Sequence, residues 1–167
     1  MDQVRKTMIR ESGFSIVEAL VALIVLSVGM LGIAALYVES LQAGRSAVYR
    51  THAVNLASDM ADRIRANRNA GNQGDAYELA AGDNPAEQGC ADTGAGSNAC
   101  DQQALAQDDL ARWLTAIRDV LPGNGNGTPS GTVDVDPAAA PTQYTITVTW
   151  SEPGEAQPLS YVVSMQI

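Results

Sequence analysis

A run of twenty residues without a charged side chain, from Ala19 to Val38, most constrains how this chain can fold. Twenty residues of α-helix span about 30 Å, which matches the hydrocarbon core of a bilayer. A helix inside a soluble domain rarely stays apolar on every face over such a length. The run therefore predicts a membrane-spanning helix near the N-terminus.

The short segment before this run carries three cations, Arg5, Lys6 and Arg10, against two acids, Asp2 and Glu11. Positive charge before a first span favours a cytoplasmic N-terminus, with the rest of the chain on the outer side. A cleaved secretory signal would have a shorter apolar stretch followed by a small-residue cleavage site. On these grounds alone, the simplest interpretation is an uncleaved signal anchor.

Glu18 does not fit a simple anchor, because it lies at the start of the apolar run. An ionisable side chain at membrane depth costs about 3 kcal/mol on insertion scales and usually marks a function. The alternative is a tolerated interfacial glutamate whose carboxylate reaches the water at the end of the span.

The hexapeptide GFSIVE, Gly13 to Glu18, follows a short charged leader and opens an apolar helix. This arrangement resembles the leader of type IV pilins. The resemblance implies that a prepilin peptidase cuts between Gly13 and Phe14 and methylates the new N-terminus at Phe14. It also implies that Glu18 meets the N-terminal amine of a neighbouring subunit. An unpaired buried charge is costly, so such pairing would select the register of an incoming subunit.

Two further stretches, Ser27 to Gly32 and Leu56 to Asn67, resemble PilV-like minor pilins, the type IV pilus modification proteins. That resemblance implies a structural subunit, not an enzyme, which needs no cofactor. Its partners would be prepilin peptidase, the inner-membrane assembly platform, the major pilin, other minor pilins and a tip adhesin. It would help to initiate pilus assembly and display the adhesin, so that adhesion and twitching motility follow indirectly. The main alternative is a minor pseudopilin of a type II secretion system.

The chain then divides into a leader (1–13), the membrane half of a long helix (14–38), its amphipathic half (39–68) and a periplasmic head (69–167). The precursor would be a single-pass inner-membrane protein, and the mature protein would join the pilus fibre or tip at the cell surface. In 45–68, apolar residues recur every three or four positions, which predicts one buried helix face. They are Tyr49, Ala53, Leu56, Met60 and Ile64.

Charge is divided unevenly between this helix and the head. Residues 45–68 contain five arginines and two aspartates, whereas 69–167 contain two arginines and 13 acids. One interpretation is a solvated helix face with local ion pairs, Asp59–Arg63 and Asp62–Arg65. The other is contact between the basic helix of one subunit and the acidic head of another. With a net charge of -9, the chain is also a poor candidate for binding nucleic acid.

The head begins with a glycine-rich stretch, 69–100, which we expect to be a loop. Cys90 and Cys100 lie in it, and an oxidising periplasm would favour a disulfide between them. Two free thiols or a redox pair are the alternatives, although the spacing is not that of a C-x-x-C motif.

The rest of the head combines one helix and three strands. Asp101 is a candidate cap for a helix over 102–121. Alternating apolar residues predict antiparallel strands over 132–136, 143–150 and 159–167. We therefore expect an α+β, pilin-like fold in which the long helix packs on a small sheet with one extra helix.

No catalytic or metal-binding constellation is evident. His52 is the single histidine, and two cysteines cannot form a zinc ribbon or a Cys/His cage. The acid pairs at 108–109 and 134/136 lack an EF-hand pattern, so we expect them to be solvated. A signal-anchored enzyme or binding module would need a concave polar site in the head. A DNA-uptake pilin would need a basic stripe there.

Overall fold

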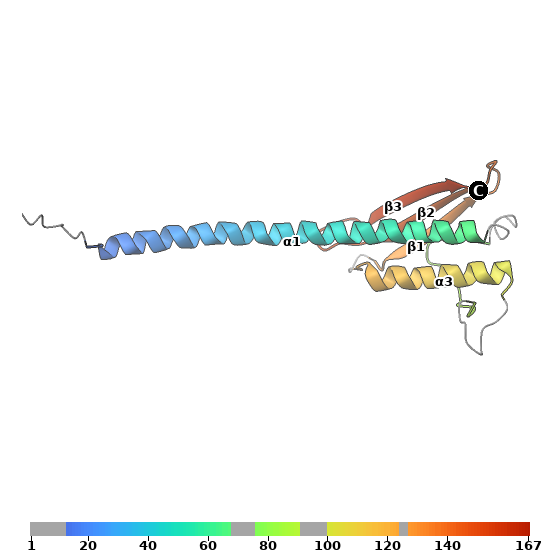
Figure 1. Ribbon diagram of the computed structural model, residues 1–167, viewed down its shortest axis with the longest axis horizontal. Helices are drawn as coiled ribbons and strands as arrows, with labels where there is room; N and C mark the ends of the chain where they lie inside the picture. The colour runs from blue at the N-terminus through green and yellow to red at the C-terminus, as the bar shows by residue number, and fades with distance from the viewer. Residues whose placement is uncertain (1–12, 68–75, 91–99, 124–126) are drawn as a thin grey trace, which may run out of the picture. The chain divides into compact units, whose positions relative to one another are not determined.

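The computed structural model describes residues 13–67, 76–90, 100–123 and 127–167. Its helices are α1 (Ile16–Ala66) and α3 (Gln102–Val120), and its strands are β1 (Ser130–Asp136), β2 (Gln143–Trp150) and β3 (Leu159–Gln166) (Figure 1). The predicted α+β, pilin-like arrangement is confirmed. The chain forms two compact units, residues 1–44 and 45–167.

In the first unit, every described residue from 13 to 44 is exposed. Phe14 is 85% exposed and Leu31 72% exposed. By length and composition, α1 could cross a membrane. Apolar side chains gathered at such density normally contact lipid or another protein.

In the second unit, α1 buries one face. Of the five residues in the predicted stripe, Ala53, Met60 and Ile64 are buried, whereas Tyr49 and Leu56 are half-buried against the core. Ala57 and Ala61 are buried as well, and their small side chains let neighbouring elements approach the helix closely.

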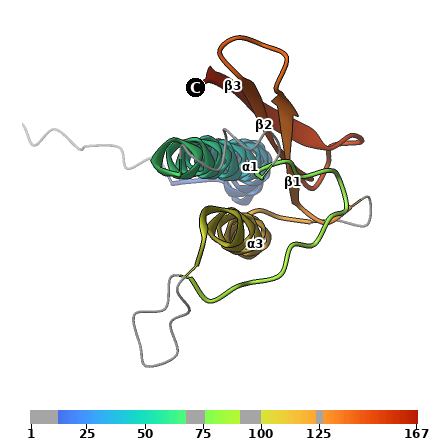
Figure 2. The same ribbon diagram turned by 90° about the vertical axis from the view of Figure 1, so that its right-hand side faces the viewer.

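The sheet has the order β1-β2-β3, and both pairs of neighbouring strands are antiparallel. Val133, Ile146 and Val163 lie in one row across it. Along β2, Tyr144, Ile146, Val148 and Trp150 are buried while the intervening threonines are only half-buried. Both helices lie on one side of the sheet (Figure 2), so the alternation of β2 separates the core face from the solvent face.

Local signals placed the remaining boundaries to within two residues. The Asp101 side chain accepts a hydrogen bond from the Ala104 N–H at 2.8 Å and caps α3 as predicted. The first strand begins at Ser130 rather than Thr132, because pairing with β2 extends it through Gly131. In the predicted loop, the described segment 76–90 makes a single β-bridge, Leu79 with Val133.

Gly131 is required by packing against Trp113. A Cβ atom at this position would overlap the Trp113 ring and lie 2.8 Å from Ile117 Cδ1. Trp113 is fully buried, and its indole N–H donates to the Leu56 carbonyl at 2.8 Å. The indole therefore has little freedom to move away from an added side chain.

We predict that Gly131→Ala destabilises the head by about 1–3 kcal/mol, as overpacking of a filled core usually does. Urea unfolding of the full chain in detergent, followed by tryptophan fluorescence, measures this change. Gly44→Ala is the matched control, because its Cβ would meet no atom within 4 Å. Equal stability of the Gly131→Ala variant and the wild type would show that Trp113 can be displaced at no cost.

Candidate functional site

The predicted processing site lies where α1 begins. Ser15 precedes the first helical residue, Ile16, and its carbonyl accepts a hydrogen bond from the Ala19 N–H at 3.2 Å. Ser15 is therefore the N-cap, and Glu18 is the third residue of the helix. A carboxylate there lies near the unpaired N–H groups and the positive end of the helix dipole.

Both residues of the predicted scissile bond are uncovered. Gly13 and Phe14 are exposed, and a Cβ atom at Gly13 would meet no atom within 4 Å. Packing within the described chain therefore gives no reason for a glycine at this position.

A polar cluster at the end of α1 links that helix to α3. Asp109 on α3 accepts from Arg63 Nη1 at 2.9 Å and from the Tyr77 hydroxyl at 2.8 Å. Asn67 Nδ2 donates to the Tyr77 hydroxyl at 3.2 Å and to the Gln102 carbonyl at 2.8 Å. The cluster ties the segment after α1 to the start of α3.

The protonation states of Tyr77 and Arg63 agree with the hydrogen bonds of this cluster. Burial raises the pKa of Tyr77 well above its ordinary value, so the hydroxyl stays protonated and donates to Asp109. Burial lowers the pKa of Arg63, but its hydrogen bonds to Asp59 and Asp109 outweigh that effect and raise it. The predicted ion pairs Asp59–Arg63 and Asp62–Arg65 are both present, at 2.9 and 2.8 Å.

Asp108 anchors the chain next to the disulfide. Its Oδ1 atom accepts from the N–H groups of Gln88 and Gly89 at 2.7 and 2.9 Å, and its Oδ2 atom accepts from Arg112 Nε at 2.8 Å. Cys90 and Cys100 form the predicted disulfide, with their Cα atoms 5.6 Å apart. Asp108 and the bridge thus hold the preceding loop against α3.

The expectation of solvated acids is wrong for Asp109, whose side chain is 14% exposed and bonded to Arg63 and Tyr77, and for Asp108, which is 1% exposed. Burial of Asp108 raises the pKa of its carboxyl, but hydrogen bonds from Gln88, Arg112 and Gly89 lower that pKa by more. The net pKa is therefore below the ordinary value. This burial could not be predicted from the sequence, because Gln88 lies twenty positions away in a stretch without periodicity.

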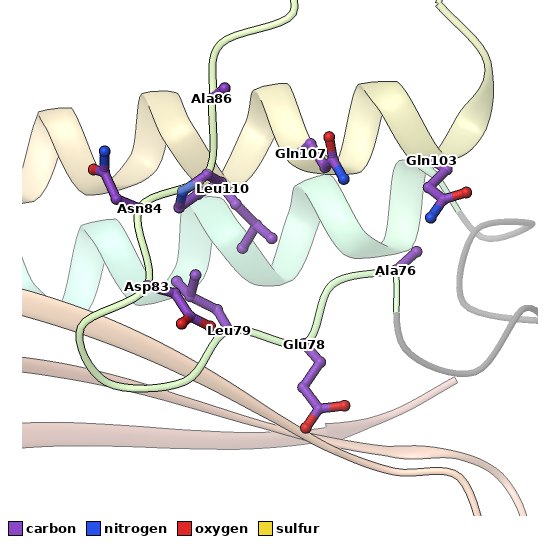
Figure 3. A pocket seen from close by; sticks show the side chains of 10 residues that line it. Ala76, Glu78, Leu79, Asp83, Asn84, Ala86, Gln103, Gln107 and Leu110 are labelled. Carbon is purple, nitrogen blue, oxygen red and sulfur yellow. The ribbon is translucent and has the colours of Figure 1, made fainter.

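A polar pocket of about 440 Å³ lies between α3 and the segment 76–86 (Figure 3). Two carboxylates, Glu78 and Asp83, and three amides, Asn84, Gln103 and Gln107, contribute to its lining. The Asp83 carboxylate also accepts from the Ala80 N–H at 2.9 Å and closes a turn. The lining offers no nucleophile with an adjacent base. Among the described residues, no three metal-ligating side chains gather.

Two family models match the chain in adjoining segments. The prokaryotic N-terminal methylation motif matches residues 8–34, and type IV pilin Tt1218 matches residues 35–111. Together these matches identify a type IV pilin. The sheet of this pilin lies beyond both matches. No curated protein and no solved structure matches the chain.

The lowered pKa of Asp108 predicts a pH-dependent stability of the pilin head. A carboxyl whose pKa is lower in the folded state stabilises the fold above its unfolded pKa, near 3.8, and loses that contribution as the pH falls through the folded value. We expect Asp108→Asn to lose about 1–3 kcal/mol at pH 7 and to show a flatter decline in acid. Urea unfolding between pH 2 and pH 7 tests this, with Asp134→Asn at an exposed position as the control. Parallel pH profiles for wild type and Asp108→Asn would contradict it.

Proposed function

We propose that this pilin is a minor type IV pilin that is cut between Gly13 and Phe14, methylated at Phe14 and assembled through Glu18. The motif GFSIVE carries the proposal, since it lies within the residues matched by the N-terminal methylation motif. The leader would be residues 1–13, the membrane or filament-core helix 14–38, its amphipathic continuation 39–68 and the periplasmic head 69–167.

The geometry of the N-terminal segment supports processing by a peptidase. The glycine has no packing role within the described chain, and a residue without a side chain lets a protease approach the backbone closely. Phe14 is 85% exposed, so its amine would be accessible to a methyltransferase after cleavage.

The exposed apolar surface of residues 14–38 would be covered first by lipid and later by other subunits. Before assembly, lipid would cover it in the inner membrane, with the N-terminus cytoplasmic and the head periplasmic. In the pilus, the helices of neighbouring subunits would replace the lipid. In the filament the Glu18 carboxylate would lose water, and the new amine of a neighbouring subunit would compensate its charge.

The proposed partners are prepilin peptidase, the assembly platform, the major pilin, other minor pilins and a tip adhesin. The stretches 27–32 and 56–67 support the minor, PilV-like assignment through their resemblance to that group. The protein would act structurally, by initiating assembly and displaying the adhesin, and would need no cofactor.

The first test is the intact mass and N-terminal sequence of the membrane-extracted protein, with and without prepilin peptidase. We expect a chain that begins at Phe14, carries one added methyl group and depends on the peptidase. A chain that keeps its leader in both strains would refute the pilin function. Deleting the gene should then reduce twitching, whereas loss of protein secretion would favour the pseudopilin alternative.

The second test removes the charge of Glu18. We expect Glu18→Gln to be cut normally but to fall about tenfold or more in sheared pili, since an unpaired buried amine costs at least one ion-pair interaction. Glu39→Gln is the matched control, because it neutralises another exposed glutamate of α1. Quantitative immunoblots of membrane and pilus fractions measure both variants. Equal incorporation of Glu18→Gln and wild type would show that the charge of Glu18 has no role in assembly.

A further inference from the structure

A second candidate surface lies in the unit formed by residues 45–167. It is a groove of about 440 Å³ between α1 and one end of the sheet, and we call it the Arg50 groove. Its lining is Arg50, Val54, Trp150, Leu159, Ser160 and Tyr161. The groove is thus mainly apolar and carries one cation.

Arg50 is available for a partner. It is exposed and makes no ion pair or hydrogen bond with any residue that the structure describes, whereas Arg63 and Arg65 are both paired. Glu152, two residues beyond the end of β2, is buried and accepts the Trp150 indole N–H at 2.8 Å. The polar atom of the indole is therefore satisfied, and the groove is left with a free guanidinium.

The apolar lining of the groove is incompletely covered. Val54 remains 37% exposed, and Leu159 and Tyr161 are only half-buried. A matching partner would present carboxylates beside small or aliphatic side chains. Such a surface would satisfy the guanidinium and exclude water from the valine and the tyrosine.

The head itself carries an acidic surface at the other end of the sheet. Asp134 and Asp136 on β1 are exposed, and Glu78 lies opposite Asp134 because Leu79 bridges Val133. None of these three acids, which we call the acidic edge, forms an ion pair within the described chain.

The strand register separates the two surfaces. Asp136 pairs with Gln143, the first residue of β2, whereas the groove lies at Trp150, its last residue. Seven steps along a strand span about 23 Å. The groove and the acidic edge therefore lie at opposite ends of one rigid sheet.

On this basis, and resting on the pilin function above, we propose that the Arg50 groove of one copy binds the acidic edge of a second copy. Charge complementarity selects this occupant, since the groove has an unpaired cation and the acidic edge has three acids without ion pairs in the described chain. The two surfaces differ, so the contact joins the groove of one copy to the acidic edge of the other.

Charge reversal tests the contact in the full-length chain. Two differently tagged copies are co-expressed, extracted in mild detergent and co-purified. We expect Arg50→Glu in both copies to lower co-purification about fivefold or more, and Asp134→Arg in both copies to do the same. Placing both substitutions in every copy should restore it, since each groove–edge contact then joins reversed charges that again attract each other.

Arg118→Glu is the matched control, because Arg118 is another exposed arginine without an ion pair in the described chain. It should leave co-purification unchanged. Urea unfolding of each variant checks that the head still folds. No loss with Arg50→Glu, or no restoration in the double variant, would overturn the proposal. So would loss of binding to a different subunit without loss of self-association.

The N-terminal mass of each sample separates this inference from the proposed function. A chain that begins at Phe14 but is indifferent to charge reversal refutes the groove contact alone. A chain that retains its leader refutes the pilin function whatever the co-purification shows.

Discussion

The indole of Trp113 holds the parts of the head together. It lies on α3, donates a hydrogen bond to the Leu56 carbonyl of α1, and fills the space that Gly131 leaves open on β1. One fully buried side chain therefore sets the distance between both helices and the first strand. The polar cluster around Asp109 fixes the same two helices further along α1, which prevents them from rotating about the indole.

Those parts of the fold that depend on neighbouring residues were predictable. Helical periodicity located the buried stripe of α1, alternation located β2 and β3, and a single aspartate located the start of α3. The long-range contacts of Asp108, Asp109 and Trp113 were not predictable, because they join residues between 19 and 57 positions apart. Residues 76–90 show neither helical nor strand periodicity. Their sequence therefore does not indicate that the backbone N–H groups of Gln88 and Gly89 bind the Asp108 carboxylate.

The candidate N-terminal site shows the opposite relation between sequence and structure. Gly13 and Phe14 have no covering residues in the described chain, so packing within that part of the chain does not explain their identity. Exposure changes along this segment: residues 13–44 are all exposed, whereas 53–67 bury every third or fourth side chain. A short exposed motif of this kind can be recognised in the sequence, because it does not depend on long-range contacts in the fold.

The structure also limits which arginines of α1 can form an ion pair with another subunit. Arg63 pairs with Asp59 and Asp109, and Arg65 pairs with Asp62. Arg45 and Arg50 are then the exposed arginines of α1 without ion pairs among the described residues. An exposed ion pair between subunits contributes only about 0–1 kcal/mol, too little to hold a subunit in place. Arg50 differs from Arg45 because it lines an apolar groove with Val54 and Tyr161. Burial of that apolar surface would supply the affinity, while the guanidinium would select an acidic partner and reject a basic one.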